Sequence, residues 1–245
     1  MCELHVVATP EENAQALAAS VARWAGQAIA GRGRFTIALS GGSTPRRVYE
    51  ILAGPPYASQ ARWDRWHVFW GDERCVPPED PSSNYRLAKE ALLDSVPGPP
   101  SQVHRMRGEE PPEEAAERYE AELAGVLGDG TPELDLVLLG IGDDGHTASL
   151  FPGSAALEED HRLVISSEGP RDGTHRLTFT LPLINAARAV AFLASGGSKA
   201  EAVRKSIEPR AGETAAPAGL VKPASGALHW FLTTDAAQQL PRVTA

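Results

Sequence analysis

Short apolar runs alternate along the chain with longer segments in which apolar residues recur every three or four positions. The short runs are typical of buried strands, and the periodic segments are typical of amphipathic helices. The pattern predicts strands at residues 4–8, 34–39, 66–70, 134–139, 163–166, 176–180, 190–195 and 228–232. It predicts helices from residue 9 to about 30, from 45 through 52, and at about 84–93, 113–127 and 199–207.

Strands that alternate with helices indicate parallel strands joined by right-handed crossovers. We therefore expect an α/β fold with a mostly parallel, doubly wound, Rossmann-like sheet and helices on both of its faces. No shift in composition divides the 245 residues, so we expect a single domain spanning residues 1–245. Residues 97–100, 109–112 and 210–217 are expected to be surface loops, the last of them mobile.

Composition narrows the range of partners and compartments. A net charge of −9 and an isoelectric point near 5.3 argue against nucleic acid and anionic membrane as partners, because both require a basic surface. No apolar stretch approaches the ~20 residues that cross a bilayer, and no signal peptide is visible. Cys2 and Cys75 are expected to be free thiols, and no cysteine or histidine cluster has metal-ligand spacing. We therefore expect a cytoplasmic protein.

The strand predicted at residues 134–139 leads into a segment rich in glycines and carboxylates, residues 140–153. In open parallel sheets, ligands bind beyond the carboxyl ends of the strands, where this segment would lie. It contains His146, two residues after Asp144. A lone loop histidine is often structural or merely exposed. Because polar loop residues on a rigid scaffold tend to be functional, we interpret His146 as a catalytic candidate.

Gly140, Gly142 and Gly145 also match the GxGxxG spacing of dinucleotide-binding turns. That motif directs the amino terminus of a helix at a pyrophosphate, and Asp143 and Asp144 would place two negative charges beside it. The acidic residue expected at the end of the next strand is also missing. We therefore do not expect a dinucleotide cofactor at this turn.

Residues 40–45 read Ser-Gly-Gly-Ser-Thr-Pro and separate a predicted strand from a helix. Gly41 and Gly42 would let backbone N–H groups approach an anion, and the amino terminus of the helix adds partial positive charge. Ser43 or Thr44 could cap that helix. A phosphate cradle and a plain turn with a helix cap fit this segment equally well.

Three cationic side chains lie near the predicted ends of strands and helices. Lys199 ends the run Gly196-Gly197-Ser198-Lys199, at the amino end of a predicted helix. A lysine there is unfavourable by ~0.3–1 kcal/mol unless an anion lies nearby, which favours an anion-binding role. Arg176 begins its predicted strand and Arg74 lies just beyond another, and for each a solvated surface arginine is an equally good interpretation.

Several segments in order along nearly the whole chain carry a family resemblance. They are residues 40–45, residues 71–77 (Gly-Asp-Glu-Arg-Cys-Val-Pro) with Ser83-Asn84-Tyr85 behind them, residues 140–153, Arg176-Leu177-Thr178, residues 197–200 and His229-Trp230-Phe231. In these segments the chain resembles the 6-phosphogluconolactonases. The resemblance implies an α/β/α sandwich, shared with glucosamine-6-phosphate deaminases and ribose-5-phosphate isomerases. It also implies hydrolysis of 6-phospho-D-glucono-1,5-lactone in the oxidative pentose phosphate pathway, with no metal or cofactor.

The deaminases carry similar loops at the positions of residues 40–45, 71–73 and 140–146, so the residues after those loops discriminate. Residues 147–152 read Thr-Ala-Ser-Leu-Phe-Pro, whereas the deaminases resemble Ile-Ala-Phe-Asn-Glu-Pro. This chain therefore lacks the glutamate that supports ring opening in that family. Residues 74–77, Arg-Cys-Val-Pro, also have the lactonase form.

The residue chemistry suits this reaction. His146 is the candidate general base and then acid, because an imidazole can take a proton from water and return it to the leaving oxygen. Asp144 would orient or stabilise the ring, and Arg74 would polarise the carbonyl or bind a sugar hydroxyl. The other expected substrate-binding residues are Gly41, Gly42, Ser43, Thr44, Arg176 and Lys199 for the phosphate, and Asp72 and Glu73 for sugar contacts or loop bracing.

Two alternatives stay open beside a lactonase acting on a small sugar-phosphate lactone. One is a glucosamine-6-phosphate deaminase or isomerase on the same fold. The other is a non-catalytic sugar-phosphate sensor, which would be expected to lack His146 and to carry a DNA-binding segment. The sequence does not distinguish a monomer from a homodimer.

Overall fold

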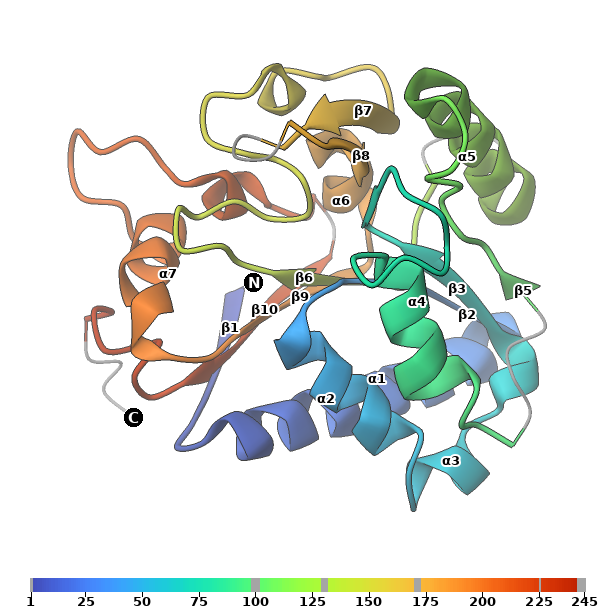
Figure 1. The fold of residues 1–245 in the computed structure, drawn as a ribbon. Coiled ribbons are helices and arrows are strands. Elements are labelled where there is room, and N and C mark those ends of the chain that lie inside the picture. The colour runs from blue at the N-terminus through green and yellow to red at the C-terminus, as the bar shows by residue number, and fades with distance from the viewer. Residues whose placement is uncertain (1, 98–101, 129–131, 170–172, 225, 242–245) are drawn as a thin grey trace.

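The computed structural model describes residues 2–97, 102–128, 132–169, 173–224 and 226–241. Its central sheet consists of seven strands: β1 (Cys2–Val7), β2 (Phe35–Leu39), β3 (Trp66–Trp70), β5 (Gln102–Val103), β6 (Leu136–Gly140), β9 (Ala189–Ala194) and β10 (Ala227–Thr233). Their order is β1-β10-β9-β6-β2-β3-β5, and every neighbouring pair is parallel (Figure 1). The parallel sheet predicted from the alternating pattern is confirmed.

The chain leaves the middle of this sheet in two directions. From β2 it continues to β3 and β5 on one side, and from β6 it continues to β9 and β10 on the other. Because β2 and β6 are neighbours, the direction of winding reverses between them. In such sheets a crevice forms at the reversal, beyond the carboxyl ends of the two strands.

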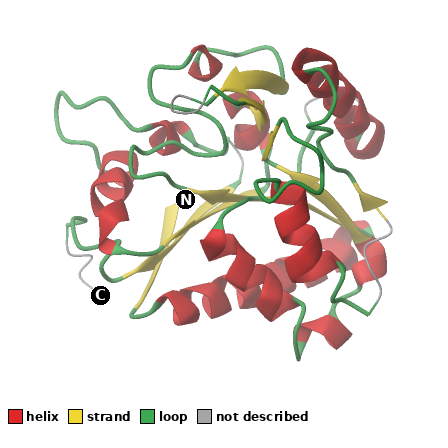
Figure 2. Ribbon diagram, viewed as in Figure 1, coloured by secondary structure: helices red, strands yellow, loops and turns green. Residues whose placement is uncertain are grey.

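Helices cover both faces of the sheet (Figure 2). They are α1 (Pro10–Arg32), α2 (Ser43–Leu52), α3 (Tyr57–Gln60), α4 (Asn84–Ala88), α5 (Pro112–Leu127), α6 (Leu181–Ala186) and α7 (Ala200–Ile207). The first four pack on one face and α5, α6 and α7 on the other, each group with its own apolar core. The three-layer α/β/α arrangement is therefore confirmed. None of the described helices is long and apolar enough to cross a membrane.

The boundaries of α1 follow from local signals in the sequence. Thr9 is the N-cap: its hydroxyl accepts from the backbone N–H of Glu12, and the Glu12 carboxylate accepts from the backbone N–H of Thr9. Gly33, in the left-handed region at φ +77°, follows the last turn. The helix predicted from residue 9 to about 30 thus begins and ends close to its expected positions.

The strands predicted at residues 163–166 and 176–180 exist but do not join the parallel sheet. They are β7 (Val164–Glu168) and β8 (His175–Phe179), and they form a separate antiparallel sheet with β4 (Asp72–Arg74) in the order β4-β8-β7. The parallel arrangement expected for them was wrong. The segment between residues 168 and 175 is too short for a crossover, which takes about a dozen residues or more, but it suffices for a hairpin.

The predicted loops differ in outcome. Residues 98–100 lie outside the described residues. Residues 109–111 precede α5, which begins at Pro112, one residue earlier than predicted. Residues 210–216 lead irregularly into a short 3₁₀ turn at Pro217–Leu220, and their expected mobility stays a prediction.

Candidate active site

A pocket opens at the carboxyl ends of β2 and β6, where the direction of winding reverses. Its walls come from the loops after these two strands, from β4 and β8 of the small sheet, and from the start of α7. Its lining residues are Ser40, Gly41, Gly42, Asp72, Arg74, Gly140, Ile141, Gly142, His146, Thr147, Ala148, Arg176 and Lys199. The fold therefore brings together most of the residues that the sequence analysis singled out.

His146 and Asp144 form a bonded pair in the loop after β6. Nδ1 of His146 lies 2.6 Å from Oδ1 of Asp144, and the backbone N–H of His146 donates to the same oxygen at 3.1 Å. Burial raises the pKa of Asp144, but the hydrogen bonds from His146 outweigh it, so the pKa lies below its usual value. Because Asp144 stays an acceptor, we infer that the neutral ring carries its proton on Nδ1 and that Nε2 is the basic atom.

Glycines make this loop geometry possible. A Cβ on Gly142 would lie 2.1 Å from Nδ1 of His146 and 2.6 Å from Oδ1 of Asp144. Gly145 has a φ of +82°, and a Cβ there would lie 2.4 Å from the Cβ of Ala216. Gly142 thus allows the close approach of the His146 and Asp144 side chains, and Gly145 allows the loop to pack against Ala216.

The small sheet places Arg74 beside Arg176. Arg74 in β4 lies directly opposite Arg176 in β8, and both side chains line the pocket. Arg74 donates to the carbonyl oxygen of Ser82 at 2.5 Å, and the Arg176 guanidinium lies 5.5 Å from the ring centroid of Phe151. Like charges directly opposite one another destabilise an antiparallel pair, so their presence here favours an anion-binding role.

Lys199 lies just before α7 and reaches the same pocket. Its Nζ is 2.7 Å from Oδ1 of Asp143, and the hydrogen bond from Lys199 holds the pKa of Asp143 below its usual value. The anion expected beside this lysine is therefore a carboxylate of the chain itself. Because the Asp143 side chain is 63% exposed, the ion pair contributes little, and a phosphate can replace it as the partner of Lys199.

The turn between β2 and α2 differs in part from its prediction. Gly42, at φ +103°, is the N-cap of α2, and neither Ser43 nor Thr44 caps the helix because both already lie in its first turn. The capping role expected for these two residues was wrong. Gly41 and Gly42 line the pocket, whereas Ser43 and Thr44 line the adjoining hollow.

Asp72 lines the pocket, but its carboxylate accepts hydrogen bonds from the start of α4 and from the loop after β6. Oδ2 accepts from the hydroxyl of Ser149 at 2.8 Å, and Oδ1 accepts from Nδ2 of Asn84 at 3.2 Å. Gly41 makes room for this amide, since a Cβ there would lie 1.8 Å from Oδ1 of Asn84. Of the two roles expected for Asp72, sugar contact or loop bracing, these contacts support bracing.

Glu73 lies outside the pocket lining and is 2% exposed. One carboxylate oxygen accepts from the backbone N–H groups of Arg74 and Asn84, and the other accepts from the N–H of Tyr85 and the hydroxyl of Ser83. Burial raises the pKa of this carboxyl, and the four hydrogen bonds only partly oppose the rise. These contacts place Glu73 as the brace between β4 and the start of α4.

We expect Glu73→Gln to lower the free energy of unfolding by about 2–5 kcal/mol, because an amide NH2 cannot accept the two buried hydrogen bonds that one carboxylate oxygen accepts. Urea unfolding followed by circular dichroism measures this change. Glu201→Gln, at an exposed carboxylate paired with Lys205, is the control and should change stability by less than about 0.5 kcal/mol. Equal stability of the two variants would contradict the bracing role.

The pH dependence of this difference has a defined sign. The raised pKa means that the folded state holds the Glu73 proton more tightly than the unfolded state does. The stability that Glu73 contributes is therefore greatest at acid pH, and it declines as the pH rises above the ordinary value of 4.5 toward the raised one. The difference between the unmodified chain and Glu73→Gln should shrink in that direction.

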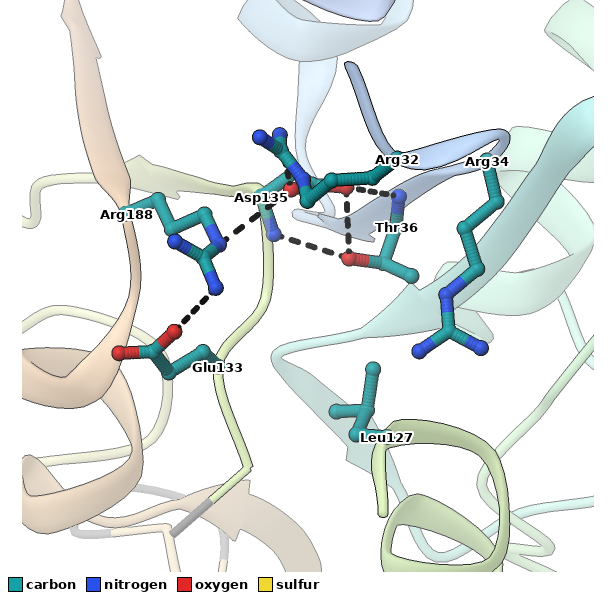
Figure 3. Close-up of a pocket in the computed structure, with 7 residues that line it drawn as sticks. All are labelled: Arg32, Arg34, Thr36, Leu127, Glu133, Asp135 and Arg188. Atoms are coloured by element: carbon teal, nitrogen blue, oxygen red, sulfur yellow. Dashed lines mark hydrogen bonds and ion pairs between the residues drawn. The ribbon is translucent and has the colours of Figure 1, made fainter. Parts of the chain in front are cut away.

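A second polar hollow lies at the opposite edge of the sheet, where the strands begin (Figure 3). There Asp135 accepts from Arg32 at 2.5 Å and from the backbone N–H of Thr36 at 2.9 Å. Its lining residues are Arg32, Arg34, Thr36, Leu127, Glu133, Asp135 and Arg188, with no imidazole among them. Since the carboxylates here already bind neighbouring arginines, the candidate chemistry remains in the first pocket.

Residues 8–230 match the family model described as glucosamine-6-phosphate isomerases/6-phosphogluconolactonase. The chain belongs to this family. A 6-phosphogluconolactonase of Synechocystis sp. is 47% identical over 218 residues, which cover 87% of this chain and 88% of that protein. One from Rattus norvegicus is 40% identical over 241 residues, covering 97% and 93%. The solved 6-phosphogluconolactonase from Trypanosoma brucei has a TM-score of 0.88 at 29% identity, covering 98% of this chain and 99% of that one.

Membership of the isomerase/lactonase family confirms the resemblance found in the sequence, but some residues of the site were missed. Asn84 and Ser149 hold Asp72. Both lie in segments that carry the resemblance, but nothing in the sequence indicates their contact with Asp72. Ala148 also lines the pocket, and its backbone has a φ of +47°. Among the described residues other than glycine, Ala148 alone has a positive φ. An alanine has no side-chain chemistry that would have pointed to it.

Proposed function

We propose that this chain hydrolyses 6-phospho-D-glucono-1,5-lactone to 6-phospho-D-gluconate, the lactonase step of the oxidative pentose phosphate pathway. The observation that carries the proposal is the bonded pair of His146 and Asp144 beside a pocket lined by three cationic side chains. A general base next to an anion-binding wall suits a substrate with a lactone at one end and a phosphate at the other. Relatives named 6-phosphogluconolactonase at 40% and 47% identity support the same activity.

Catalysis begins when Nε2 of His146 removes a proton from the water that attacks the lactone carbonyl carbon. Nε2 takes this role because Nδ1 is bonded to Asp144. The ionised carboxylate of Asp144 stabilises the imidazolium that forms. The ring then returns the proton to the ring oxygen of the lactone as the carbon–oxygen bond breaks, which leaves 6-phosphogluconate and a neutral His146.

The three cationic side chains contact different parts of the substrate. Lys199 and Arg176 hold the phosphate together with the backbone at Gly41 and Gly42, and the amino terminus of α2 at Ser43 and Thr44 adds partial positive charge. Arg74, opposite Arg176 in the small sheet, faces the lactone end, where it polarises the carbonyl oxygen or holds a sugar hydroxyl. Asp72 and Glu73 keep these loops in place.

The decay rate of freshly generated 6-phosphogluconolactone, measured with and without the purified chain, tests the activity. We expect acceleration with no added cofactor, and the same rate after exhaustive chelation. The catalytic groups proposed are an imidazole, carboxylates and organic cations, and the one group of three potential metal ligands among the described residues (Glu3, His5 and His229) lies away from the pocket. Loss of activity on chelation, with rescue by Zn²⁺, would contradict the metal-free mechanism.

Glucosamine 6-phosphate is the control substrate for the nearest alternative. A coupled assay should detect no turnover of it, whereas turnover of glucosamine 6-phosphate without lactonase activity would favour a deaminase. The His146–Asp144 pair disfavours a non-catalytic sensor. A single domain, a monomer or homodimer, and a cytoplasmic location all stay predictions; light scattering after size-exclusion chromatography measures the oligomeric state.

A further inference from the structure

Three potential metal ligands from the two ends of the chain meet on one face of the central sheet. In the parallel pair of β1 and β10, Glu3 lies directly opposite His229, and His5 lies opposite Phe231. Because side chains alternate along a strand, these four side chains share one face. It is the face that α1 covers, since Trp24 of α1 packs on His229 with ring centroids 4.8 Å apart.

The separations of the three ligand atoms match those of a metal site. Nδ1 of His229 lies 3.3 Å from Nε2 of His5 and 3.3 Å from Oε2 of Glu3, and the third side of the triangle is 3.9 Å. A tetrahedral ion with ligand bonds of 2.0–2.2 Å holds its ligand atoms about 3.3–3.6 Å apart. The triangle therefore fits one face of a coordination tetrahedron after a movement of only a few tenths of an ångström.

Aromatic packing holds the two imidazoles in place. The His5 ring stacks on Phe231 with centroids 4.3 Å apart and an interplanar angle of 11°. The His229 side chain is 8% exposed, whereas those of His5 and Glu3 are 34% and 48% exposed. The buried side fixes the ligands, and the open side leaves room for a water molecule as the fourth ligand.

We propose that Glu3, His5 and His229 bind a divalent transition-metal ion, with Zn²⁺ preferred. Two imidazoles and a carboxylate with a water in the fourth position form a ligand set typical of Zn²⁺, whereas Mg²⁺ and Ca²⁺ take oxygen ligands. Among the described residues, no other group of three histidine, cysteine or carboxylate side chains comes this close together.

The position of the site indicates a structural role for the ion. Glu3 and His229 lie near the beginnings of β1 and β10, at the edge of the sheet opposite the His146 pocket. β1 is an edge strand whose one neighbour in the sheet is β10. A bound ion links this edge strand to β10 and so stabilises the folded chain, and it takes no part in lactone hydrolysis.

Titration calorimetry of the full chain with Zn²⁺ tests the proposal, with Mg²⁺ as the negative control. We expect one equivalent of Zn²⁺ to bind and to raise the Tm by mass action, and Mg²⁺ to do neither. His5→Gln removes a proposed ligand of the ion. Loss of a residue that merely hydrogen-bonds a metal ligand weakens metal binding by about 10–100-fold, so His5→Gln should weaken Zn²⁺ binding by at least that much. It should also abolish the Tm shift. His161→Gln is the matched control, since His161 is an exposed histidine beside Asp160.

Further variants separate this site from the catalytic pocket and from a folding defect. His146→Gln should bind Zn²⁺ like the unmodified chain, and His5→Gln should keep its lactonase activity. Glu3→Gln changes an exposed side chain and should also weaken Zn²⁺ binding without unfolding the chain. Failure of the unmodified chain to bind Zn²⁺, equal Zn²⁺ affinity in His5→Gln, or loss of binding only in His146→Gln would overturn the proposal.

Discussion

The His146→Ala variant should keep its fold and its affinity for phosphate but lose about 10²–10⁴-fold in kcat, the usual contribution of a positioned general acid–base group. The side chain is 33% exposed and lies in a loop, so its removal leaves no buried cavity. His146→Gln should do no better, because an amide can hydrogen-bond the attacking water but cannot accept its proton. Steady-state kinetics on 6-phosphogluconolactone, corrected for spontaneous decay, measure the effect.

Two controls make the His146→Ala result specific. Calorimetry with 6-phosphogluconate should give similar affinity for the unmodified chain and the variant, and His161→Ala should leave kcat unchanged. The lowered pKa of Asp144 means that its carboxylate takes up a proton only below its ordinary value of 3.8, so an acid limb of kcat/KM above that pH belongs to another group.

A kcat of His146→Ala within a few fold of that of the unmodified chain would contradict the proposed role of His146 as general base. Asp144 would then be the next candidate base, because its carboxylate lies in the same loop and contacts the same ring. In that case Asp144→Asn should lose more activity than His146→Ala does.

Lys199→Ala should weaken binding of 6-phosphogluconate and raise KM for the lactone by about 10–100-fold, since it removes a charge-assisted contact to the phosphate worth about 1.5–3 kcal/mol. Arg176→Ala should have a similar effect. Lys205→Ala is the matched control, because that lysine pairs with Glu201 on the exposed side of α7. Calorimetry reports the change in affinity without the kinetic terms that KM contains.

A substrate without phosphate separates a phosphate contact from a general defect. Gluconolactone should be hydrolysed at nearly the same rate by the unmodified chain and by Lys199→Ala, because it has no group for the lysine to bind. Equal losses on both substrates would mean that Lys199 is structural or catalytic, and the phosphate pocket would have to be placed elsewhere.

Much of the fold is encoded in local patterns. β2 is buried at all five positions and β9 at all six. β9 therefore appears in the sequence as an unbroken apolar run, and β2 as one interrupted only by Thr36. The signals at both ends of α1 act within a few residues of each helix terminus. The glycine-rich loops after β2 and β6 are recognisable because Gly41 lies too close to Asn84, and Gly142 too close to His146, for a residue with a Cβ. His146 and Asp144 could be named as a pair because they stand two residues apart in the same loop.

Contacts between distant segments could not be obtained in this way. β4 has three residues, too few for a periodic pattern, yet its pairing with β8 places Arg74 opposite Arg176. Periodicity shows that a segment is a strand but not which strand it joins, so the hairpin of β7 and β8 was mistaken for part of the parallel sheet.

The side-chain partners at the site depend on the same long-range packing. For Glu73 the sequence left sugar contact and loop bracing open, and the approach of α4 supplies the contacts that support bracing. His5 and His229 show no metal-ligand spacing, because 224 positions separate them along the chain. They become neighbours when β1 pairs with β10, since hydrogen bonds between strands bring residues together regardless of their distance in sequence.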